Sequence, residues 1–116
     1  MNKRVLLTVA MTIPLSLPSF SPTAAGSPML DETKIEVGDL VFDALVAGPE
    51  DGPVVFMLHG FPQTAFEWRH QMPVLASMGF RVIAPNQRGY SAGARPEGVD
   101  AYTIPNLVAD VVGMAD

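Results

Sequence analysis

His59, Gly60, Phe61 and Pro62 form the part of the sequence best suited to chemistry. They directly follow residues 54–58, an apolar run typical of a strand buried on both faces of a parallel sheet. Ligands of α/β proteins bind beyond the carboxyl ends of such strands. A loop there can aim a backbone N–H at an oxygen that gains negative charge, as in ester hydrolysis. The alternative interpretation is a tight turn around a hydrogen-bonded histidine, with no catalytic role.

Other reactive groups are scarce. The absence of cysteine excludes disulfides, thiolate metal sites and a cysteine nucleophile. His59 and His70 are the only histidines, too few for a histidine metal cluster, and we expect neither metal nor cofactor. We interpret His59 as a structural histidine bonded to loop backbone and His70 as part of a helix surface or loop. Asp110 and Asp116 are interpreted as solvated helix positions rather than a catalytic pair.

The segment before this loop predicts a pair of antiparallel strands. Residues 34–37 alternate polar and apolar side chains, as a half-buried strand does. Gly38 and Asp39 are a turn signal, and residues 40–47 then place an apolar side chain at every second position. The sequence therefore predicts a β-hairpin, followed by a loop over residues 48–53.

A helix is predicted after the loop. Thr64 is the expected N-cap, and Glu67, three residues later, completes the pattern of a capping box. The apolar stripe runs from Phe66 to about residue 80, with Pro73 expected to kink the helix or split it in two. Gly79 is expected to end it as a C′ glycine.

Three further elements follow: a buried strand at residues 81–85, a glycine-rich loop at residues 86–96 and a helix at residues 103–116. Together the elements predict an α/β fold in which an antiparallel strand pair leads into a mainly parallel sheet with flanking helices. The last helix reaches Asp116 with no strand after it, and we expect the sheet to be incomplete.

Two motifs in order carry a family resemblance. Residues 54–62, with Phe66-Glu67-Trp68-Arg69, and residues 81–91 resemble the α/β-hydrolase superfamily. The resemblance extends over roughly residues 34–116, and within the superfamily it is most similar to the epoxide hydrolase and haloalkane dehalogenase branch. It implies that the chain is the N-terminal part of an α/β-hydrolase fold.

The resemblance also implies roles for individual residues. The Phe61 position of the family donates one oxyanion-hole N–H, and the residue after the nucleophile donates the other. The family's peptide bond before Pro62 is typically cis. Trp68 packs the first helix or lines the pocket, and Tyr90 is a second candidate for pocket lining.

One departure from the family pattern concerns the loop after residues 81–85. Many relatives have Asp where this chain has Asn86, which puts a family ion pair with Arg88 in doubt. Arg88 is expected either to pair with another carboxylate or to be a surface charge.

The reacting groups of the family are absent from these 116 residues. The resemblance places the family's nucleophile elbow, orienting acid and catalytic histidine further along the chain, after the helix at residues 103–116. We therefore expect no hydrolase activity from this polypeptide alone. Half of a sheet exposes an apolar strand edge, so we also expect poor stability in isolation.

Three functions remain open. The first is a fragment of a cofactor-independent hydrolase acting on a small neutral molecule. Because Phe61 lacks the amide with which Asn helps to hold a halide in dehalogenases, epoxide or ester hydrolysis is favoured, and residues 59–71 most resemble epoxide hydrolases. A serine esterase or lipase is the runner-up. The second is a non-catalytic secreted module on the same scaffold, and the third is a truncated product without a role.

The N-terminus has the order of a secretory signal peptide. Lys3 and Arg4 precede an apolar run over residues 5–17, and small residues at Thr23 and Ala25 fit cleavage after Ala25. We predict a signal peptide at residues 1–25, a partial hydrolase domain at residues 26–116, and a secreted or periplasmic protein. The alternative is an uncleaved anchor or an apolar tail, although the run is shorter than the roughly 20 residues that span a membrane.

The net charge of the chain limits the kinds of partner that it is expected to bind. The formal net charge of −5 and the lack of a basic stripe exclude nucleic acid as an expected partner. A small-molecule substrate is expected, with no stable membrane anchor. Nothing in the sequence predicts an oligomeric state.

Overall fold

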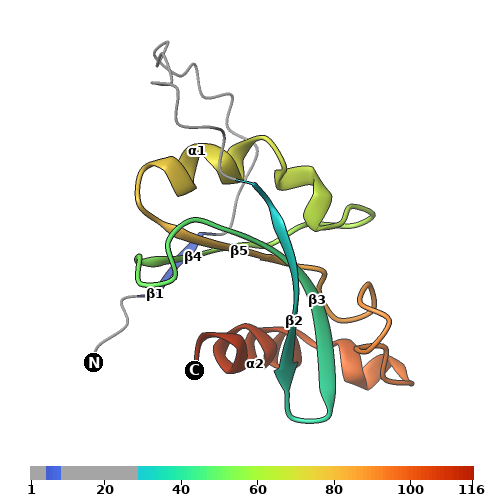
Figure 1. The fold of residues 1–116 in the computed structure, drawn as a ribbon. Helices are drawn as coiled ribbons and strands as arrows, with labels where there is room; N and C mark the ends of the chain where they lie inside the picture. The colour runs from blue at the N-terminus through green and yellow to red at the C-terminus, as the bar shows by residue number, and fades with distance from the viewer. Residues whose placement is uncertain (1–4, 9–28) are drawn as a thin grey trace.

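The computed structural model describes residues 5–8 and 29–116 (Figure 1). Within them, five strands form one mixed sheet in the order β1-β4-β5-β3-β2. Figure 1 shows α1 on one face of this sheet and α2 on the other, as in an α/β protein. The elements are β1 (Val5–Thr8), β2 (Asp31–Val37), β3 (Leu40–Ala47), β4 (Val54–Met57), the 3₁₀ helix η1 (Ala65–Trp68), α1 (Gln71–Ser77), β5 (Arg81–Pro85), the 3₁₀ helix η2 (Val99–Tyr102) and α2 (Ile104–Ala115).

The predicted hairpin is confirmed. β2 and β3 pair antiparallel from Asp31 opposite Val46 to Val37 opposite Leu40. Gly38 takes a positive φ of 57° in the turn, a conformation open to glycine at little cost. The inward face of β3 is apolar and buried at every second residue, as the alternation predicted. β2 begins at Asp31, three residues before the expected start.

β4 is the buried parallel strand that the apolar run predicted. It pairs parallel with β5 on one side and parallel with β1 on the other. Val55, Phe56 and Met57 are all buried. The strand ends at Met57, so residues 59–62 follow its carboxyl end directly.

The first helix is divided, and its start differs from the prediction. η1 ends at Trp68 and α1 begins at Gln71, so the break precedes Pro73, which lies in the first turn of α1 where proline is tolerated. The capping box is not formed: the Thr64 side chain makes no cap hydrogen bond, and its carbonyl accepts the Glu67 N–H at 3.1 Å. Because the Glu67 N–H already donates to the Thr64 carbonyl in the 3₁₀ turn, it is not available to the Thr64 hydroxyl.

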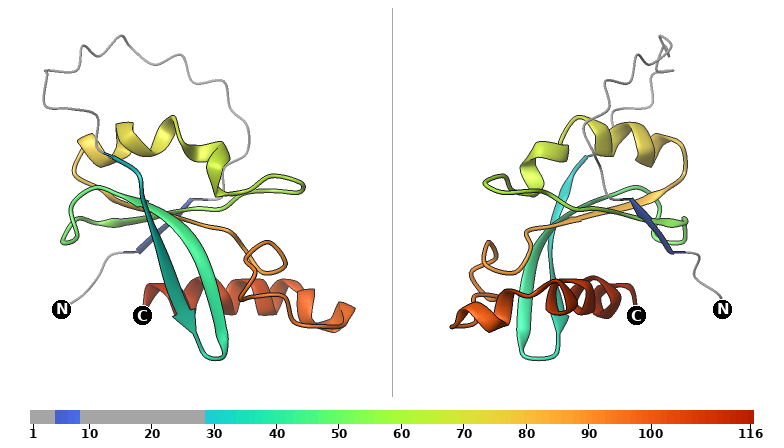
Figure 2. Two further views of the ribbon diagram at one scale, coloured as in Figure 1. Left: turned by 45° about the vertical axis from the view of Figure 1, so that its right-hand side comes forward. Right: turned by 180° about the vertical axis from the view of Figure 1, so that it is seen from behind.

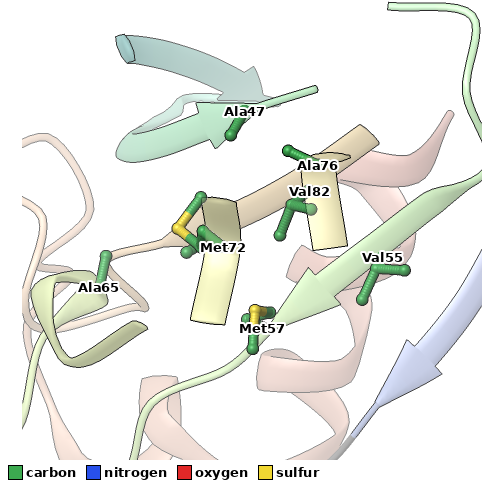
Figure 3. Packing of buried hydrophobic residues seen from close by; sticks show 8 residues of the cluster. Ala47, Val55, Met57, Ala65, Met72, Ala76 and Val82 are labelled. Atoms are coloured by element: carbon green, nitrogen blue, oxygen red, sulfur yellow. The ribbon is translucent and has the colours of Figure 1, made fainter. Parts of the chain in front are cut away.

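The end of α1 agrees with the prediction. Gly79 follows the C-cap with a φ of 94°. Its N–H donates to the Ala76 carbonyl at 3.0 Å, and the Phe80 N–H donates to the Leu75 carbonyl at 3.2 Å, the bonding pattern of a Schellman motif. The buried residues of α1 pack on the sheet around β4 and β5 (Figure 3). This cluster comprises Ala47, Val55, Met57, Ala65, Met72, Ala76, Val82 and Ala84.

Phe66 departs from the predicted apolar stripe, because its side chain is 62% exposed. It lies in η1, whose tighter winding does not continue the periodicity of α1. The Arg69 guanidinium lies over its ring, 4.3 Å from the centroid.

The predicted leader is described in part. Val5–Thr8 form β1, whereas residues 1–4 and 9–28, which include the cleavage site after Ala25, lie outside the described residues. The signal peptide therefore stays a prediction. None of the helices in the described ranges has the length and apolar character needed to cross a membrane.

Candidate functional site

The candidate site is the loop that leaves the carboxyl end of β4. The Phe61 side chain is 89% exposed, and Gly60 and Pro62 are exposed beside it. The Phe61–Pro62 peptide is cis, the isomer that the resemblance implied. Within residues 5–8 and 29–116, no group accepts a hydrogen bond from the Phe61 N–H, whereas the Gln63 N–H donates to the Gly60 carbonyl at 3.0 Å. The Phe61 amide thus lies beyond the strand ladder in an open turn.

His59 is the buried base of this loop, with 6% exposure. Its Nε2 accepts the backbone N–H of Gln87 at 3.0 Å. Nδ1 lies 3.0 Å from the Gly60 carbonyl, to which it can only donate. The two contacts together define a neutral ring protonated at Nδ1. In this form His59 has no free nitrogen to act as a base.

Gln87 holds the loop from the end of the neighbouring strand. Besides its backbone bond to the imidazole, its side-chain amide donates to the His59 carbonyl. Because β4 and β5 are parallel neighbours, the residues that follow them meet at one edge of the sheet. Gln87 therefore hydrogen-bonds both the ring and the main-chain carbonyl of His59.

Asn86 and Ser91 extend this network under the loop. Asn86 Oδ1 accepts the Ala65 N–H at 2.8 Å, which ties the end of β5 to η1. Ser91 is fully buried; its hydroxyl donates to the Asn86 carbonyl at 2.5 Å and accepts the Asp43 N–H at 2.9 Å. The loop after β5 is thereby fixed to both β3 and η1.

The two candidate pocket residues differ in their contacts. The half-buried Tyr90 ring meets the imidazole edge-on, with centroids 4.5 Å apart and planes at 80°. Trp68 is partly buried against the α1 cluster. Its Nε1 is buried and has no hydrogen-bond partner among the described residues. Tyr90 thus contacts His59 of the loop, whereas Trp68 packs against the hydrophobic cluster.

The prediction that Asp110 is a solvated helix residue is wrong. Asp110 is 5% exposed and accepts two hydrogen bonds from Arg88, from Nε at 2.8 Å and from Nη2 at 2.7 Å. Arg88 Nη1 also donates to the Ala101 carbonyl at 2.9 Å. The hydrogen bond to Asp110 raises the pKa of Arg88 despite the opposing effect of burial. Arg88 is thus a largely buried ion-pair partner, with a side chain 13% exposed, rather than a surface charge. Asp116 is exposed, as expected.

Sequence reasoning missed Gln87, Ser91 and Asp110. Gln87 carried a usable signal, because a polar residue just past a buried strand reaches the same sheet edge as His59. Asp110 carried another, since it shares a helix face with Leu107 and Val111 and so falls on the buried side of α2. Ser91 stands at the centre of Gly89-Tyr90-Ser91-Ala92-Gly93, but this pattern does not indicate that its hydroxyl is buried and joins two other segments.

The described surface around Phe61 is one wall rather than a closed pocket. The open hollow beside β2 and β3 includes Asn86 in its lining but not Phe61. Within the described ranges, no three histidine or acidic side chains gather to hold a metal ion. The site therefore offers one backbone donor, the Phe61 N–H, on a loop that hydrogen bonds from Gln87 hold in place.

The fold and the loop are those of a hydrolase family. Residues 53–114 match the alpha/beta hydrolase fold family, and the chain belongs to it. Within the family it is similar to epoxide hydrolases. It is 45% identical to epoxide hydrolase A of Mycobacterium tuberculosis over 85 residues, which cover 73% of this chain and 26% of that protein. It is 41% identical to the AB hydrolase superfamily protein YfhM of Bacillus subtilis over 80 residues, 69% of this chain and 28% of that protein.

Solved structures give the same relationship. Epoxide hydrolase A of Mycobacterium thermoresistibile superposes with a TM-score of 0.72 at 40% identity, covering 76% of this chain and 28% of that one. Epoxide hydrolase VrEH1 of Vigna radiata gives 0.66 at 40% identity, covering 72% and 27%. The chain therefore spans about a quarter of the length of the relatives it matches, and corresponds to their N-terminal portion.

Proposed function

We propose that this chain supplies the oxyanion loop of an epoxide hydrolase-type α/β hydrolase that uses water and no cofactor. The observation that carries the proposal is the Phe61 amide, which lies beyond the end of β4 outside the ladder, on a loop gripped by Gln87. In hydrolysis of a covalent ester intermediate, negative charge gathers on the former carbonyl oxygen. A fixed N–H at that point stabilises the charge without reorganising, and one such donor is worth about 3–4 kcal/mol of barrier in other enzymes.

The reacting groups come, in this proposal, from residues outside this sequence. The Gly-x-Ser-x-Gly match at residues 89–93 lies in the loop after β5, and the hydroxyl of its Ser91 is fully buried and hydrogen-bonded at both sides, so it is not placed as a nucleophile. Both histidines are accounted for by the loop base and an exposed helix start. A nucleophile, its orienting acid and a general-base histidine are needed to complete the site. We propose that the chain by itself does not turn over substrate. We further propose a small neutral organic substrate and a secreted or periplasmic location, which rests on the predicted signal peptide.

A chimera tests whether this loop is catalytically competent. Residues 31–116 would replace the matching N-terminal stretch of Mycobacterium tuberculosis epoxide hydrolase A, which is 45% identical over 85 residues. The chimera, the parent enzyme and the 116-residue chain would each be assayed with a small aryl epoxide and with a p-nitrophenyl ester. We expect the chimera to open the epoxide and the isolated chain to convert neither compound.

The outcomes separate the alternatives. A chimera that melts cooperatively but is inactive would reject the oxyanion role and favour a non-catalytic module. Turnover of the ester alone would favour the esterase interpretation. Hydrolysis by the isolated chain would show that the reacting groups lie within these residues, against the proposal.

A further inference from the structure

The turn that follows β5 brings both of its ends onto His59. The Tyr90 N–H donates to the Gln87 carbonyl at 2.8 Å, which closes a β-turn. Gly89, its third residue, has the positive φ of 92° that a type II turn requires. In both views of Figure 2, the loop after β5, in orange, leaves the sheet at the same end as the yellow-green loop after β4. The first and last residues of the turn therefore meet the base of the loop after β4 together.

The two hydrogen bonds of the His59 ring leave it one freedom of movement. Nε2 accepts the Gln87 N–H at 3.0 Å, and Nδ1 lies 3.0 Å from the Gly60 carbonyl. Hydrogen bonds of an imidazole lie in the plane of its ring, so they resist tilting about the line through the two nitrogens only weakly. The Tyr90 ring stands at 80° to the imidazole, with centroids 4.5 Å apart, an arrangement that aromatic pairs favour. A ring packed at this angle limits the tilt.

The main chain of the turn is held by two other contacts. Arg88 pairs with Asp110 of α2 at 2.7 Å. Arg95 donates to the Gly89 carbonyl at 3.2 Å and to the Tyr90 carbonyl at 3.3 Å. The position of the Tyr90 ring is thus set by contacts other than the imidazole that it meets, as a support requires.

We propose that Tyr90 is a positioning residue of the hydrolase, whose ring fixes the His59 imidazole and thereby the direction of the Phe61 N–H. Tyr90 acts in this role through His59 and not on the substrate. The Gly60 carbonyl links the two, because it faces Nδ1 of the ring and also accepts the Gln63 N–H at 3.0 Å, which closes the turn around Phe61. A tilted ring would lose the Gly60 contact, and the amide would no longer be fixed before negative charge develops. This inference rests on the oxyanion role proposed above.

Kinetics of the chimera that carries residues 31–116 test the role in catalysis. Tyr90→Leu removes the aromatic contact, and Tyr90→Phe keeps the ring. Tyr102→Leu is the matched control, because the Tyr102 ring packs beside Gly89 of the same turn and its hydroxyl donates to the Pro96 carbonyl at 2.8 Å. Tyr90→Leu should lower kcat for the epoxide by about three- to tenfold, the factor that one aromatic pair contributes, with a smaller change in KM. Tyr90→Phe and Tyr102→Leu should retain the kcat of the unsubstituted chimera.

Nitrogen-15 and proton NMR of the same proteins test the contact without the reaction. Loss of the neighbouring aromatic ring should shift the ring-proton signals of His59 in Tyr90→Leu and speed the exchange of its Nδ1–H with water. Tyr90→Phe should leave the Nδ1–H as slow to exchange as in the unsubstituted chimera, and Tyr102→Leu should change neither signal. A purely structural role of Tyr90 would lower the melting temperature without this selective change at His59.

The two measurements separate the possible failures. An inactive unsubstituted chimera that melts cooperatively would reject the oxyanion role, while the NMR comparison still decides whether Tyr90 holds the imidazole. Unchanged His59 signals or an unchanged kcat in a folded Tyr90→Leu chimera would overturn the proposal, as would an equal loss of kcat in Tyr102→Leu. If Tyr90→Leu does not fold, cross-peaks between the ring protons of Tyr90 and His59 in the unsubstituted chimera decide, and their absence rejects the contact.

Discussion

Arg88 and Asp110 join the loop after β5 to α2 through two parallel hydrogen bonds of 2.8 Å and 2.7 Å. Their side chains are only 13% and 7% exposed. A fork-to-fork contact of this kind fixes direction as well as distance. Because Gln87 precedes Arg88 directly, the ion pair also anchors the residue that grips His59. The hydrogen bonds that hold the Phe61 loop in place are therefore connected, through Gln87 and Arg88, to α2, which lies on the face of the sheet opposite α1.

Asp110→Asn should destabilise the chain strongly. The change leaves the largely buried Arg88 charge without its counter-ion. Breaking a fully buried pair lowers the free energy of unfolding by about 3–5 kcal/mol, and we expect a loss toward the lower end of that range because Arg88 keeps some contact with water. Urea unfolding of the chimera that carries residues 31–116, followed by circular dichroism, measures the loss. Asp116→Asn, at the exposed end of the same helix, is the control and should change stability by less than about 0.5 kcal/mol. Equal effects of the two variants would show that the ion pair contributes nothing specific.

The contribution of this pair should not vary with pH over the neutral to moderately alkaline range. Hydrogen bonding to Asp110 raises the pKa of Arg88 in the folded chain. A raised folded-state pKa gives stability that is complete below the unfolded pKa and is lost only as pH rises through the folded value. Arginine stays charged far above pH 10, so the stability difference between wild type and Asp110→Asn should be constant from about pH 7 to about pH 10. A steady decline across that window would show that another group titrates with the pair.

Ser91→Ala should also destabilise, although the side chain is small. The hydroxyl is fully buried and serves the Asp43 N–H and the Asn86 carbonyl at once. Leaving buried partners unsatisfied lowers stability by about 1–3 kcal/mol. Ser77→Ala removes an exposed hydroxyl that bonds only within α1 and should change stability by less than about 0.5 kcal/mol. A Ser91→Ala chain as stable as Ser77→Ala would mean that water replaces the missing hydroxyl.

Much of the fold could be predicted because its signals are local. Alternation over residues 40–47 and the continuous apolar run before His59 define strands from neighbouring residues alone, and Gly79 marks the end of α1 in the same way. The capping box failed as a prediction because Thr64 starts a 3₁₀ turn, and the choice between 3₁₀ and α geometry depends on packing against the sheet.

The site was predictable only where it depends on one segment. The turn at Phe61 follows from the strand before it, whereas the partners of Arg88 and Ser91 come from segments that only the folded sheet brings together. Asp110 is the instructive case. A carboxylate is expected in solvent unless it is paired, and its partner could not be known before the packing of α2 was known.

Gln87→Ala should loosen the loop without changing the protonation of His59. The substitution removes the side-chain donor to the His59 carbonyl but keeps the backbone N–H that donates to Nε2. We expect a loss of about 1 kcal/mol, with faster exchange of the Gln63 amide that closes the turn. Nitrogen-15 NMR should find the Nδ1-protonated tautomer in both proteins. Gln63→Ala is the control, because it replaces an exposed side chain and keeps the backbone N–H that closes the turn. An Nε2-protonated ring in the wild type would contradict the assignment.

Two substitutions of Phe61 separate the catalytic contribution of its backbone N–H from that of its side chain. In the chimera, Phe61→Ala keeps the N–H, so kcat for the epoxide should stay within about tenfold of the unsubstituted chimera, because the exposed ring contributes no donor. Phe61→Pro deletes the N–H and should lower kcat by about 10²–10³-fold, the usual effect of losing one oxyanion donor. Melting curves show whether either variant has lost its fold, and a larger change in kcat than in KM marks an interaction made in the transition state. If alanine lowered kcat as much as proline in folded proteins, the aromatic side chain rather than the amide would carry the function of this loop.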